Sequence, residues 1–180
     1  MENLVEQAKD GNGEAFTELI LQIQNELYKI AKMRLTNEED VNDAIQESMI
    51  IAFKSIRKLR DSKYFKTWFI KILINECNKI YNKQRKFPVE EFDDTILFNQ
   101  NSIENEFEII NSNINFSLVL KNLEYEERIL LTLYYAEEFT YKEIGKILGI
   151  NTNTVKTKIT RTKNKIKKIY GRDRIYGQLR

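Results

Sequence analysis

Histidine is absent from the 180 residues, and cysteine, proline and glycine are scarce. Without histidine, Ser-His and Cys-His catalysis and zinc sites that use cysteine with histidine are excluded. The single cysteine, Cys77 in ILINECNKI, cannot form an intrachain disulfide, which fits a reducing compartment, and we interpret it as a small helix residue. One proline and six glycines indicate an all-α chain, because both residues interrupt regular structure.

Long apolar runs are also missing. The N-terminus, MENLVEQAKDGNGEAF, is polar and acidic, which predicts no secretory leader. No uninterrupted apolar stretch approaches the length that crosses a bilayer, and no GxxxxGK loop for a nucleoside triphosphate is present. We therefore expect a cytoplasmic protein without membrane insertion, bound cofactor or metal ion.

The charges are strongly segregated, although the net charge is only +2. Residues 87–115 contain seven Asp and Glu residues and no Lys or Arg, whereas residues 54–86 and 142–174 are dominated by Lys and Arg. This pattern predicts two basic surfaces separated by an acidic connector. Nucleic acid is the expected partner of such surfaces, with a membrane face or an anionic protein as the open alternatives.

The stretch YKEIGKILGINTNTVKTKITR, residues 141–161, has the pattern of a helix-turn-helix. Apolar residues recur at helical spacing up to Leu148, Gly149 interrupts them, and Asn151 or Thr152 is suited to cap a second helix. Two short helices joined by a tight turn with glycine are typical of this motif. A solvated basic helix is the alternative, but it does not explain the glycine, the cap and the apolar register together.

The second helix of this motif is predicted to read DNA in the major groove. Short polar side chains lie opposite its apolar stripe: Asn153, Thr157, Thr160 and Asn164. Lysines flank them on both sides, with Lys156, Lys163 and Lys167 on one side and Lys158 and Lys165 on the other. We expect the short groups to meet base edges and the long cations to reach phosphates.

The N-terminal half is predicted to form three amphipathic helices. The first runs from Phe16 to Leu35, after the turn at residues 10–13, and Thr36 or Asn37 caps the second. The buried stripe of the second helix is predicted to be Val41, Ala44, Ile45, Met49, Ala52, Phe53 and Ile56. A connection over residues 56–63 leads to a third helix from about Tyr64 to Arg85, which has Phe65, Trp68, Phe69, Ile72, Leu73 and Ile80 for a core. Pro88 ends this lobe, and a second lobe begins near Phe116.

The segment DVNDAIQES, residues 40–48, contains an acidic helix face. Asp40, Asp43 and Glu47 are spaced i, i+3 and i+7, which places their carboxylates on one side of a helix. Like charges in this arrangement slightly destabilise an isolated helix, whereas a basic partner would make them complementary. A solvated surface is the alternative interpretation.

The basic and aromatic region from Lys58 to Lys86 is suited to unpaired nucleic acid. Extruded bases stack on aromatic rings beside cations, at about 1–3 kcal/mol per base, which can offset the few kcal/mol that flipping a base costs. We expect Phe65, Trp68 and Phe69 to be mainly core, and Tyr64 with the preceding loop to touch a base. Because no motif for ATP binding is present, any strand opening would be driven by binding energy.

Taken together, these motifs resemble the bacterial RNA polymerase sigma factors, and in particular the compact extracytoplasmic-function (ECF) group. DVNDAIQES is similar to that family's polymerase-docking motif, and FKTWFIKILINECNKIYNKQRK, residues 65–86, looks like its helix that melts and reads the −10 element. The stretch from Leu123 to Ile166 resembles the domain whose second helix reads the −35 element. Two positions depart from the family: Glu124 stands where proline is usual, and Gly145 where alanine is usual. In addition, Leu73-Ile74 replaces a small-basic pair, so no phosphate contact is assigned to Ile74.

The resemblance implies two small helical domains: residues 1–87 for polymerase docking and the −10 element, and residues 116–180 for the −35 element, joined by a flexible acidic linker, 88–115. The implied core-polymerase contacts are Asp40, Asp43, Gln46 and Glu47. The −10 contacts are Lys58, Arg60, Lys63, Tyr64, Lys71, Asn75, Asn78, Lys79 and Asn82. The −35 contacts are Thr152, Asn153, Lys156, Thr157, Thr160, Arg161 and Lys163. Implied partners are core RNA polymerase, promoter DNA and an anti-sigma factor.

Two other functions fit part of the sequence. A stand-alone helix-turn-helix regulator would use the N-terminal lobe for dimerisation or ligand binding, and it should bind a palindrome without polymerase. A nucleic-acid enzyme would need a metal-binding acidic cluster, and no DxD-type cluster followed by a histidine or a basic catalytic group is present. We therefore expect a non-enzymatic initiation factor.

Overall fold

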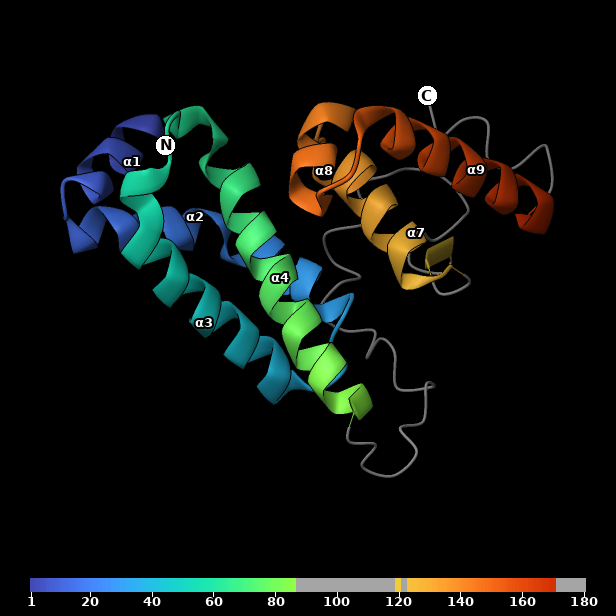
Figure 1. Ribbon diagram of the computed structural model, residues 1–180, viewed down its shortest axis with the longest axis horizontal. Helices are drawn as coiled ribbons and strands as arrows, with labels where there is room; N and C mark the ends of the chain where they lie inside the picture. The colour runs from blue at the N-terminus through green and yellow to red at the C-terminus, as the bar shows by residue number, and fades with distance from the viewer. Residues whose placement is uncertain (87–118, 121–122, 171–180) are drawn as a thin grey trace.

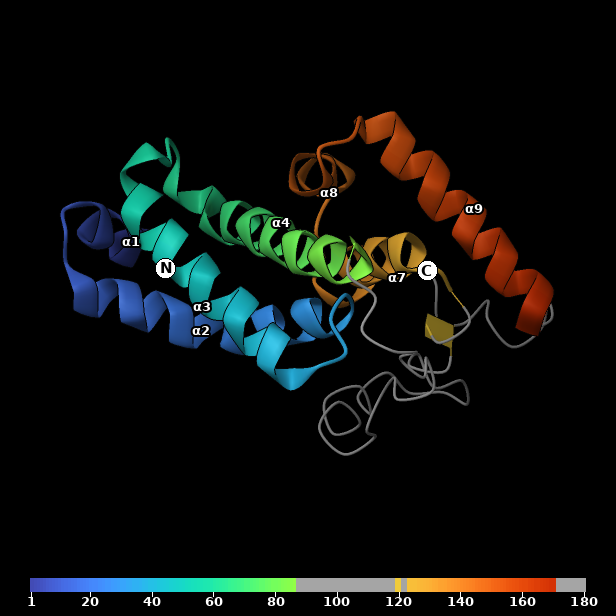
Figure 2. The same cartoon turned by 60° about the horizontal axis from the view of Figure 1, so that its bottom comes forward.

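The protein is all-α over the residues that the computed structural model describes, which are 1–86, 119–120 and 123–170. The predicted acidic connector and its boundary at Pro88 lie outside these residues. The helices form an N-terminal lobe, residues 1–86, and a C-terminal lobe, residues 119–170 (Figure 1). Helix α4 lies between the two groups, with α2 and α3 packed on one side of it and α8 on the other, as the second view also shows (Figure 2).

The N-terminal lobe contains four α-helices: α1 (Glu2–Lys9), α2 (Gly13–Lys32), α3 (Glu38–Ser55) and α4 (Phe65–Lys86). The side chain of Asn12 accepts a hydrogen bond from Ala15 N at 3.1 Å and starts α2, and Asn37 starts α3 in the same way. The three predicted helices are confirmed within a few residues. Helix α1 was not predicted, and two 3-10 turns, η1 (Ile56–Lys58) and η2 (Ser62–Tyr64), lie in the predicted connection.

The buried side of α3 matches its predicted stripe except at one residue. Val41, Ala44, Ala52 and Ile56 are at most 1% exposed, while Phe53 is 47% exposed, so its prediction as a core residue was wrong. Its ring makes an edge-to-face contact with Phe16, with ring centroids 5.2 Å apart. In this part of α3, which packs against α2 and α4, the buried positions are Ser48 and Ala52. Phe53 lies outside this buried side of the helix.

The C-terminal lobe contains α7 (Tyr125–Leu131), a short π-helical turn η3 (Thr132–Ala136), α8 (Tyr141–Leu148) and α9 (Thr152–Tyr170). Thr140 caps α8 by accepting a hydrogen bond from Glu143 N, and Asn151 caps α9 by accepting one from Asn153 N at 2.8 Å. Gly149 ends α8 with a left-handed conformation, φ 69°, which a glycine adopts without strain. The predicted helix-turn-helix is therefore confirmed.

Glu124 and Gly145, the two positions that depart from the pattern of the family that the chain resembles, both have a structural role. Glu124 donates its backbone N–H to Glu127 Oε2 at 3.0 Å, and proline at this position could not do so. At Gly145, the carbonyl of Ile150 lies where a side chain would begin, since a Cβ atom there would be 2.8 Å from Ile150 O. The backbone of the turn between α8 and α9 thus occupies the space that an alanine side chain would need.

We predict that Gly145→Ala destabilises the protein by about 1 kcal/mol. Alanine is the better helix former by about 1 kcal/mol, but its Cβ would force the backbone at Ile150 to move, which costs more than that gain. Gly13→Ala, at an open helical position, is the control and should be neutral or slightly stabilising. Urea denaturation of both variants measures the difference, and a more stable Gly145→Ala variant would contradict it.

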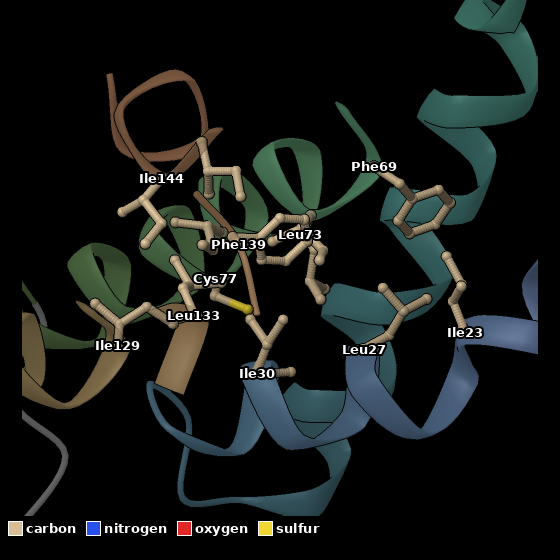
Figure 3. Packing of buried hydrophobic residues seen from close by; sticks show 14 of the residues in the cluster. Ile23, Leu27, Ile30, Phe69, Leu73, Cys77, Ile129, Leu133, Phe139 and Ile144 are labelled. Carbon is tan, nitrogen blue, oxygen red and sulfur yellow. The ribbon is translucent and has the colours of Figure 1, made fainter. Parts of the chain in front are cut away.

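The two lobes share a hydrophobic core. Buried side chains of α2 and α4, including Ile30, Leu73 and Cys77, belong to the same cluster as Leu133 and Phe139 of the C-terminal lobe (Figure 3). Cys77 is 1% exposed, and burial raises the pKa of its thiol to about 12, so it is an inert core residue as interpreted. The sequence alone did not indicate how the lobes would pack.

Candidate protein and nucleic-acid interfaces

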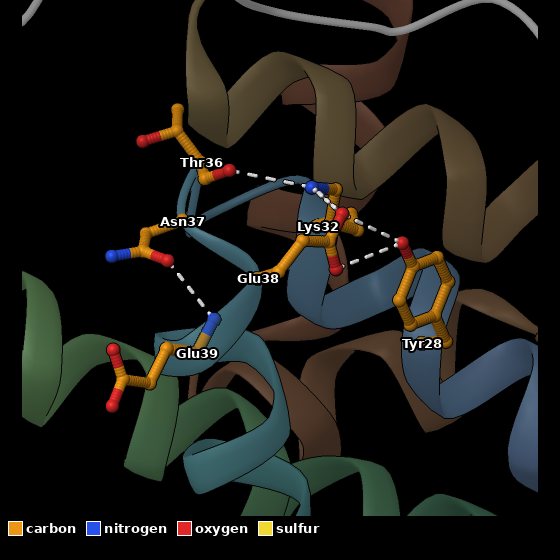
Figure 4. Close-up of polar contacts among 6 residues, drawn as sticks. All are labelled: Tyr28, Lys32, Thr36, Asn37, Glu38 and Glu39. Carbon is orange, nitrogen blue, oxygen red and sulfur yellow. Dashed lines mark hydrogen bonds and ion pairs between the residues drawn. The ribbon is translucent and has the colours of Figure 1, made fainter.

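The acidic face of α3 is held in place by the join between α2 and α3. Lys32 Nζ, near the end of α2, lies 2.6 Å from Glu38 Oε1 and also donates to the carbonyl oxygen of Thr36 (Figure 4). Tyr28 donates to both carboxylate oxygens of Glu38, and Asn37 accepts from Glu39 N at 2.9 Å. These contacts fix the first turn of α3, and with it the direction in which the following carboxylates point.

The predicted docking residues lie together on this helix. Asp43, Gln46 and Glu47 are exposed, opposite Val41 and Ala44, which are fully buried. Asp40 is half-buried and accepts a hydrogen bond from Gln84 Nε2 of α4 at 2.7 Å, so it is already engaged within the protein. The structure thus leaves three of the four side chains free to contact a partner.

An apolar patch that was not predicted continues this face. Ile50 is 45% exposed and Phe53 is 47% exposed, and both follow Gln46 at helical spacing, i+4 and i+7. The surface of α3 therefore changes from acidic to apolar along its length. The sequence contains these apolar residues, but the helical periodicity led to the prediction that Phe53 is a core residue.

The basic loop before α4 is braced by α1. Asp61 accepts from Lys63 N at 3.2 Å, Ser62 is buried and hydrogen bonds to Glu6, and Arg57 Nε donates to Lys9 O at 2.9 Å. This arrangement leaves three predicted −10 residues exposed, Lys58, Arg60 and Lys63. The missed helix α1 is therefore part of the support for this candidate site.

Tyr64 ends the loop and is half-buried. Two cations lie near its ring: Lys63 Nζ is 4.9 Å from the centroid, and Lys146 Nζ of α8 is 4.0 Å away. Trp68, by contrast, packs against Phe65 with centroids 6.1 Å apart and joins the core, in agreement with the prediction. The predicted base-stacking ring is therefore covered by a residue of the other lobe.

The polar face of α4 is continuous along the helix. Its predicted members are exposed, apart from the half-buried Asn78: Lys71, Asn75, Asn78, Lys79 and Asn82. Lys79 Nζ lies 2.7 Å from Glu76 Oε1 and is the member with an ion pair. Ile74, to which no phosphate contact was assigned, is 4% exposed and lies in the core.

The face of α9 that is predicted to read DNA is exposed: Thr152, Asn153, Lys156, Thr157, Thr160 and Arg161 are all accessible. Thr157 and Thr160 donate their hydroxyls to helix carbonyls four residues earlier, at 2.9 Å each, so they offer acceptor oxygens and methyl groups to a groove. Lys163 is half-buried, with Nζ 5.0 Å from the ring centroid of Tyr135 and 5.5 Å from that of Tyr134. The amine of Lys163 is thus held near two aromatic rings of η3.

One flank of lysines differs from the prediction. Lys158 Nζ lies 2.5 Å from Glu126 Oε2, and Lys165 Nζ lies 2.6 Å from Glu127 Oε2. The hydrogen bond from Lys158 holds the pKa of Glu126 below its usual range. These lysines tie α9 to α7 instead of standing free for phosphates, because two acidic residues begin α7.

The described residues form neither a metal-binding cluster nor a membrane-spanning helix. Within residues 1–86, 119–120 and 123–170, no group of three or more Cys, Asp or Glu side chains is placed to hold a metal ion. No helix in this part of the chain is long and apolar enough to span a membrane. The candidate sites are thus the acidic face of α3, the loop and polar face of α4, and the reading face of α9.

Family models match both lobes. Residues 19–87 match the model for Sigma-70 region 2, and residues 115–166 match the model for Sigma-70, region 4. The chain is 31% identical over 138 residues to the RNA polymerase sigma factor SigV of Bacillus subtilis, covering 77% of this chain and 80% of that protein. It is 27% identical over 175 residues to the ECF RNA polymerase sigma-E factor of Haemophilus influenzae, covering 91% of each.

Two solved structures share the fold. CnrH in complex with the cytosolic domain of CnrY superposes with a TM-score of 0.66 at 20% identity, covering 93% of this chain and 95% of that one. The sigma factor RpoE from Bartonella quintana, in complex with the anti-sigma factor NepR, superposes with a TM-score of 0.65 at 18% identity, covering 88% and 98%. At these identities, the likeness concerns the fold.

Proposed function

Because this chain belongs to the ECF group of RNA polymerase sigma factors, we propose that it binds core RNA polymerase and directs promoter-specific initiation of transcription. The observation that carries this function is the presence, on one chain and in order, of region 2 and region 4 matches. The exposed reading face of α9 and the acidic face of α3 agree with it. The protein acts in the cytoplasm by binding, not by catalysis, and it opens DNA with binding energy.

Each candidate surface takes one role in this proposal. The acidic face of α3 docks on the polymerase through Asp40, Asp43, Gln46 and Glu47, with basic groups of the polymerase as the complement of its three carboxylates. Helix α9 enters the major groove of the −35 element, where its lysines position it and its short polar side chains read bases. The loop before α4 and the polar face of α4 take the opened −10 strand. The domain boundaries are residues 1–87 and 116–180, joined by the acidic segment.

An anti-sigma factor is a further proposed partner. The B. quintana sigma factor with the same fold was solved with an anti-sigma factor bound. The alternative of a stand-alone helix-turn-helix regulator is not favoured, because its N-terminal lobe would be a dimerisation or ligand domain, and here that lobe matches region 2.

Run-off transcription tests the proposed function. Purified protein added to bacterial core polymerase should start transcripts at a promoter that the core enzyme alone ignores, without hydrolysis of nucleotide for opening. Core enzyme alone and the protein alone are the controls. Tight binding to a palindrome by a dimer that never yields a transcript would sink this function in favour of the regulator.

We predict that Asn153 and Lys163 contribute to −35 binding in different ways. Asn153→Ala should change the base preference, by about 1–3 kcal/mol if a bidentate contact is lost. Lys163→Ala should weaken binding to all sequences alike and reduce the salt slope by about one unit, because one phosphate contact is lost. Binding of both variants to a library of −35 sequences at several salt concentrations separates the effects. Identical sequence profiles for the two variants would show that this register of α9 is wrong.

A further inference from the structure

Helix α1 is fastened to both ends of the basic loop before α4, residues 56–64. It packs against both turns of that loop, η1 and η2 (Figure 1). At the start of the loop, Arg57 Nε donates to Lys9 O at 2.9 Å. Near its end, the hydroxyl of Ser62 donates to a carboxylate oxygen of Glu6. Glu6 and Lys9 are one helical turn apart, so a single turn of α1 holds the loop at two points.

The contact from Arg57 completes the end of α1. Lys9 is the last residue of this helix, where carbonyl groups have no partner within the helix. The carbonyls of Glu6, Gln7 and Ala8 accept from backbone N–H groups of the following turn, whereas that of Lys9 accepts from Arg57. A cation at this end also interacts favourably with the helix dipole. The first fastening point therefore stabilises the helix and the loop together.

The contact with Ser62 makes the loop depend on Glu6. Ser62 is only 8% exposed, and a buried hydroxyl without an acceptor is destabilising. Lys9 Nζ lies 3.1 Å from Glu6 Oε1 and orients the carboxylate. The hydrogen bonds from Ser62 and Lys9 lower the pKa of Glu6, so it accepts as a carboxylate at neutral pH. Without this acceptor, the loop would have to open for water to reach the hydroxyl of Ser62.

The fastened segment presents candidate −10 cations. Lys58 and Arg60 lie between the two fastening points, Lys63 follows the second one, and all three are exposed. Leu59, between the first two, is 8% exposed and belongs to the core. Glu6 places a negative charge against this basic loop, which opposes the binding of phosphates. A direct DNA contact therefore does not explain an acid at this position, whereas support of the loop does.

We infer that Glu6 is a positioning residue for the −10 strand, which holds the basic loop through Ser62 in the shape that receives unpaired DNA. The inference rests on the proposed function, because it takes the loop as a −10 contact. A loop that is ordered before binding loses less conformational entropy when the strand binds. Removal of Glu6 should therefore weaken the −10 interaction, although a repelling charge is lost. Electrostatics alone predicts the opposite sign.

The first arm of the test measures opening of the loop without DNA. A protease needs a locally opened chain, so trypsin cleavage after Lys58, Arg60 and Lys63 in the full chain, quantified by mass spectrometry, reports this opening. Glu6→Ala should be cleaved at these sites at least about fivefold faster than the wild type, because Ser62 loses its acceptor. Glu6→Gln retains an acceptor for Ser62 and should be cleaved nearly as slowly as the wild type.

Two further variants show whether the contact itself is responsible. Glu2→Ala removes the same charge from an exposed position of α1 and should be cleaved like the wild type. Ser62→Ala already lacks the donor, so adding Glu6→Ala to it should cause no further increase in cleavage. Circular dichroism checks that each variant is folded.

The second arm measures the −10 interaction at the promoter of the run-off test. At a subsaturating concentration, Glu6→Ala with core polymerase should give about fivefold fewer transcripts than the wild type. Glu6→Gln and Glu2→Ala lose the same charge but keep the loop in place, so they should give at least nearly as many as the wild type. Affinity for labelled core polymerase should be unchanged in Glu6→Ala, because the docking face lies on α3.

The two arms fail separately. Equal cleavage of folded Glu6→Ala and Glu2→Ala would overturn the claim that Glu6 holds the loop. Faster cleavage of Glu6→Ala together with a wild-type yield of transcripts would overturn its role at the −10 strand. Failure of the proposed function would appear instead as a wild-type protein that yields no transcripts, and the cleavage arm would still decide whether Glu6 holds the loop.

Discussion

Reversing both exposed carboxylates, in the variant Asp43→Lys/Glu47→Lys, should lower the affinity for core polymerase at least about a hundredfold. The two residues lie one helical turn apart on the exposed side of α3, so basic groups of the polymerase would meet like charges instead of opposite ones. Such a change amounts to several kcal/mol, and a factor of ten in affinity corresponds to about 1.4 kcal/mol. Titration of labelled core enzyme measures the loss.

The controls separate docking from folding. Because Asp43 and Glu47 are surface residues, each substitution should change the free energy of unfolding by about 0.5 kcal/mol or less, which thermal melts would show. Glu14→Lys/Glu18→Lys reverses two exposed charges with the same spacing on α2 and should keep nearly normal affinity for core polymerase. If the Asp43/Glu47 variant is folded and binds like the wild type, the acidic face of α3 is only solvated surface.

Truncating Phe69 should cost about 3–5 kcal/mol of folding free energy, the largest change in stability expected here. Phe69 lies on α4 and its side chain is completely buried, with its ring centroid 6.0 Å from that of Phe65. Alanine at this position would leave a cavity. Because folded domains are stable by only about 5–15 kcal/mol, a substantial share of the protein would unfold near physiological temperature.

Phe53→Ala is the matched control for this substitution. Phe53 is 47% exposed and makes an edge-to-face contact with Phe16, so its truncation should cost about 1 kcal/mol or less. Urea denaturation of the two variants, followed by circular dichroism, measures both losses. Similar losses for the two phenylalanines would contradict the burial described for α3 and α4.

Local patterns in the sequence predicted the helices and the exposed faces well. Asn37 and Asn151 cap the helices that follow them, and Gly149 ends the helix before it. These roles involve only neighbouring residues, so they can be inferred without the rest of the fold. Helix α1 was missed because it is only eight residues long, which gives too few apolar repeats to establish a period.

The contacts between distant segments could not be predicted in this way. Lys158 looked like a phosphate-binding residue because its partner, Glu126, is 32 positions away in the sequence. The ion pair between Lys66 and Glu137 joins residues 71 positions apart, and periodicity within one helix contains no information about such a partner. Phe53 shows the same limit, since the spacing that predicts a stripe does not tell where the neighbouring helix stops covering it.

The shared core has a consequence for how the molecule melts. Two domains linked only by a tether would denature independently and produce two heat-absorption peaks in a calorimeter. Here Cys77 and Leu73 pack with Leu133 and Phe139, so loss of either lobe would expose apolar surface of the other and raise its heat capacity. The lobes should therefore unfold as one cooperative unit, with equal calorimetric and van't Hoff enthalpies.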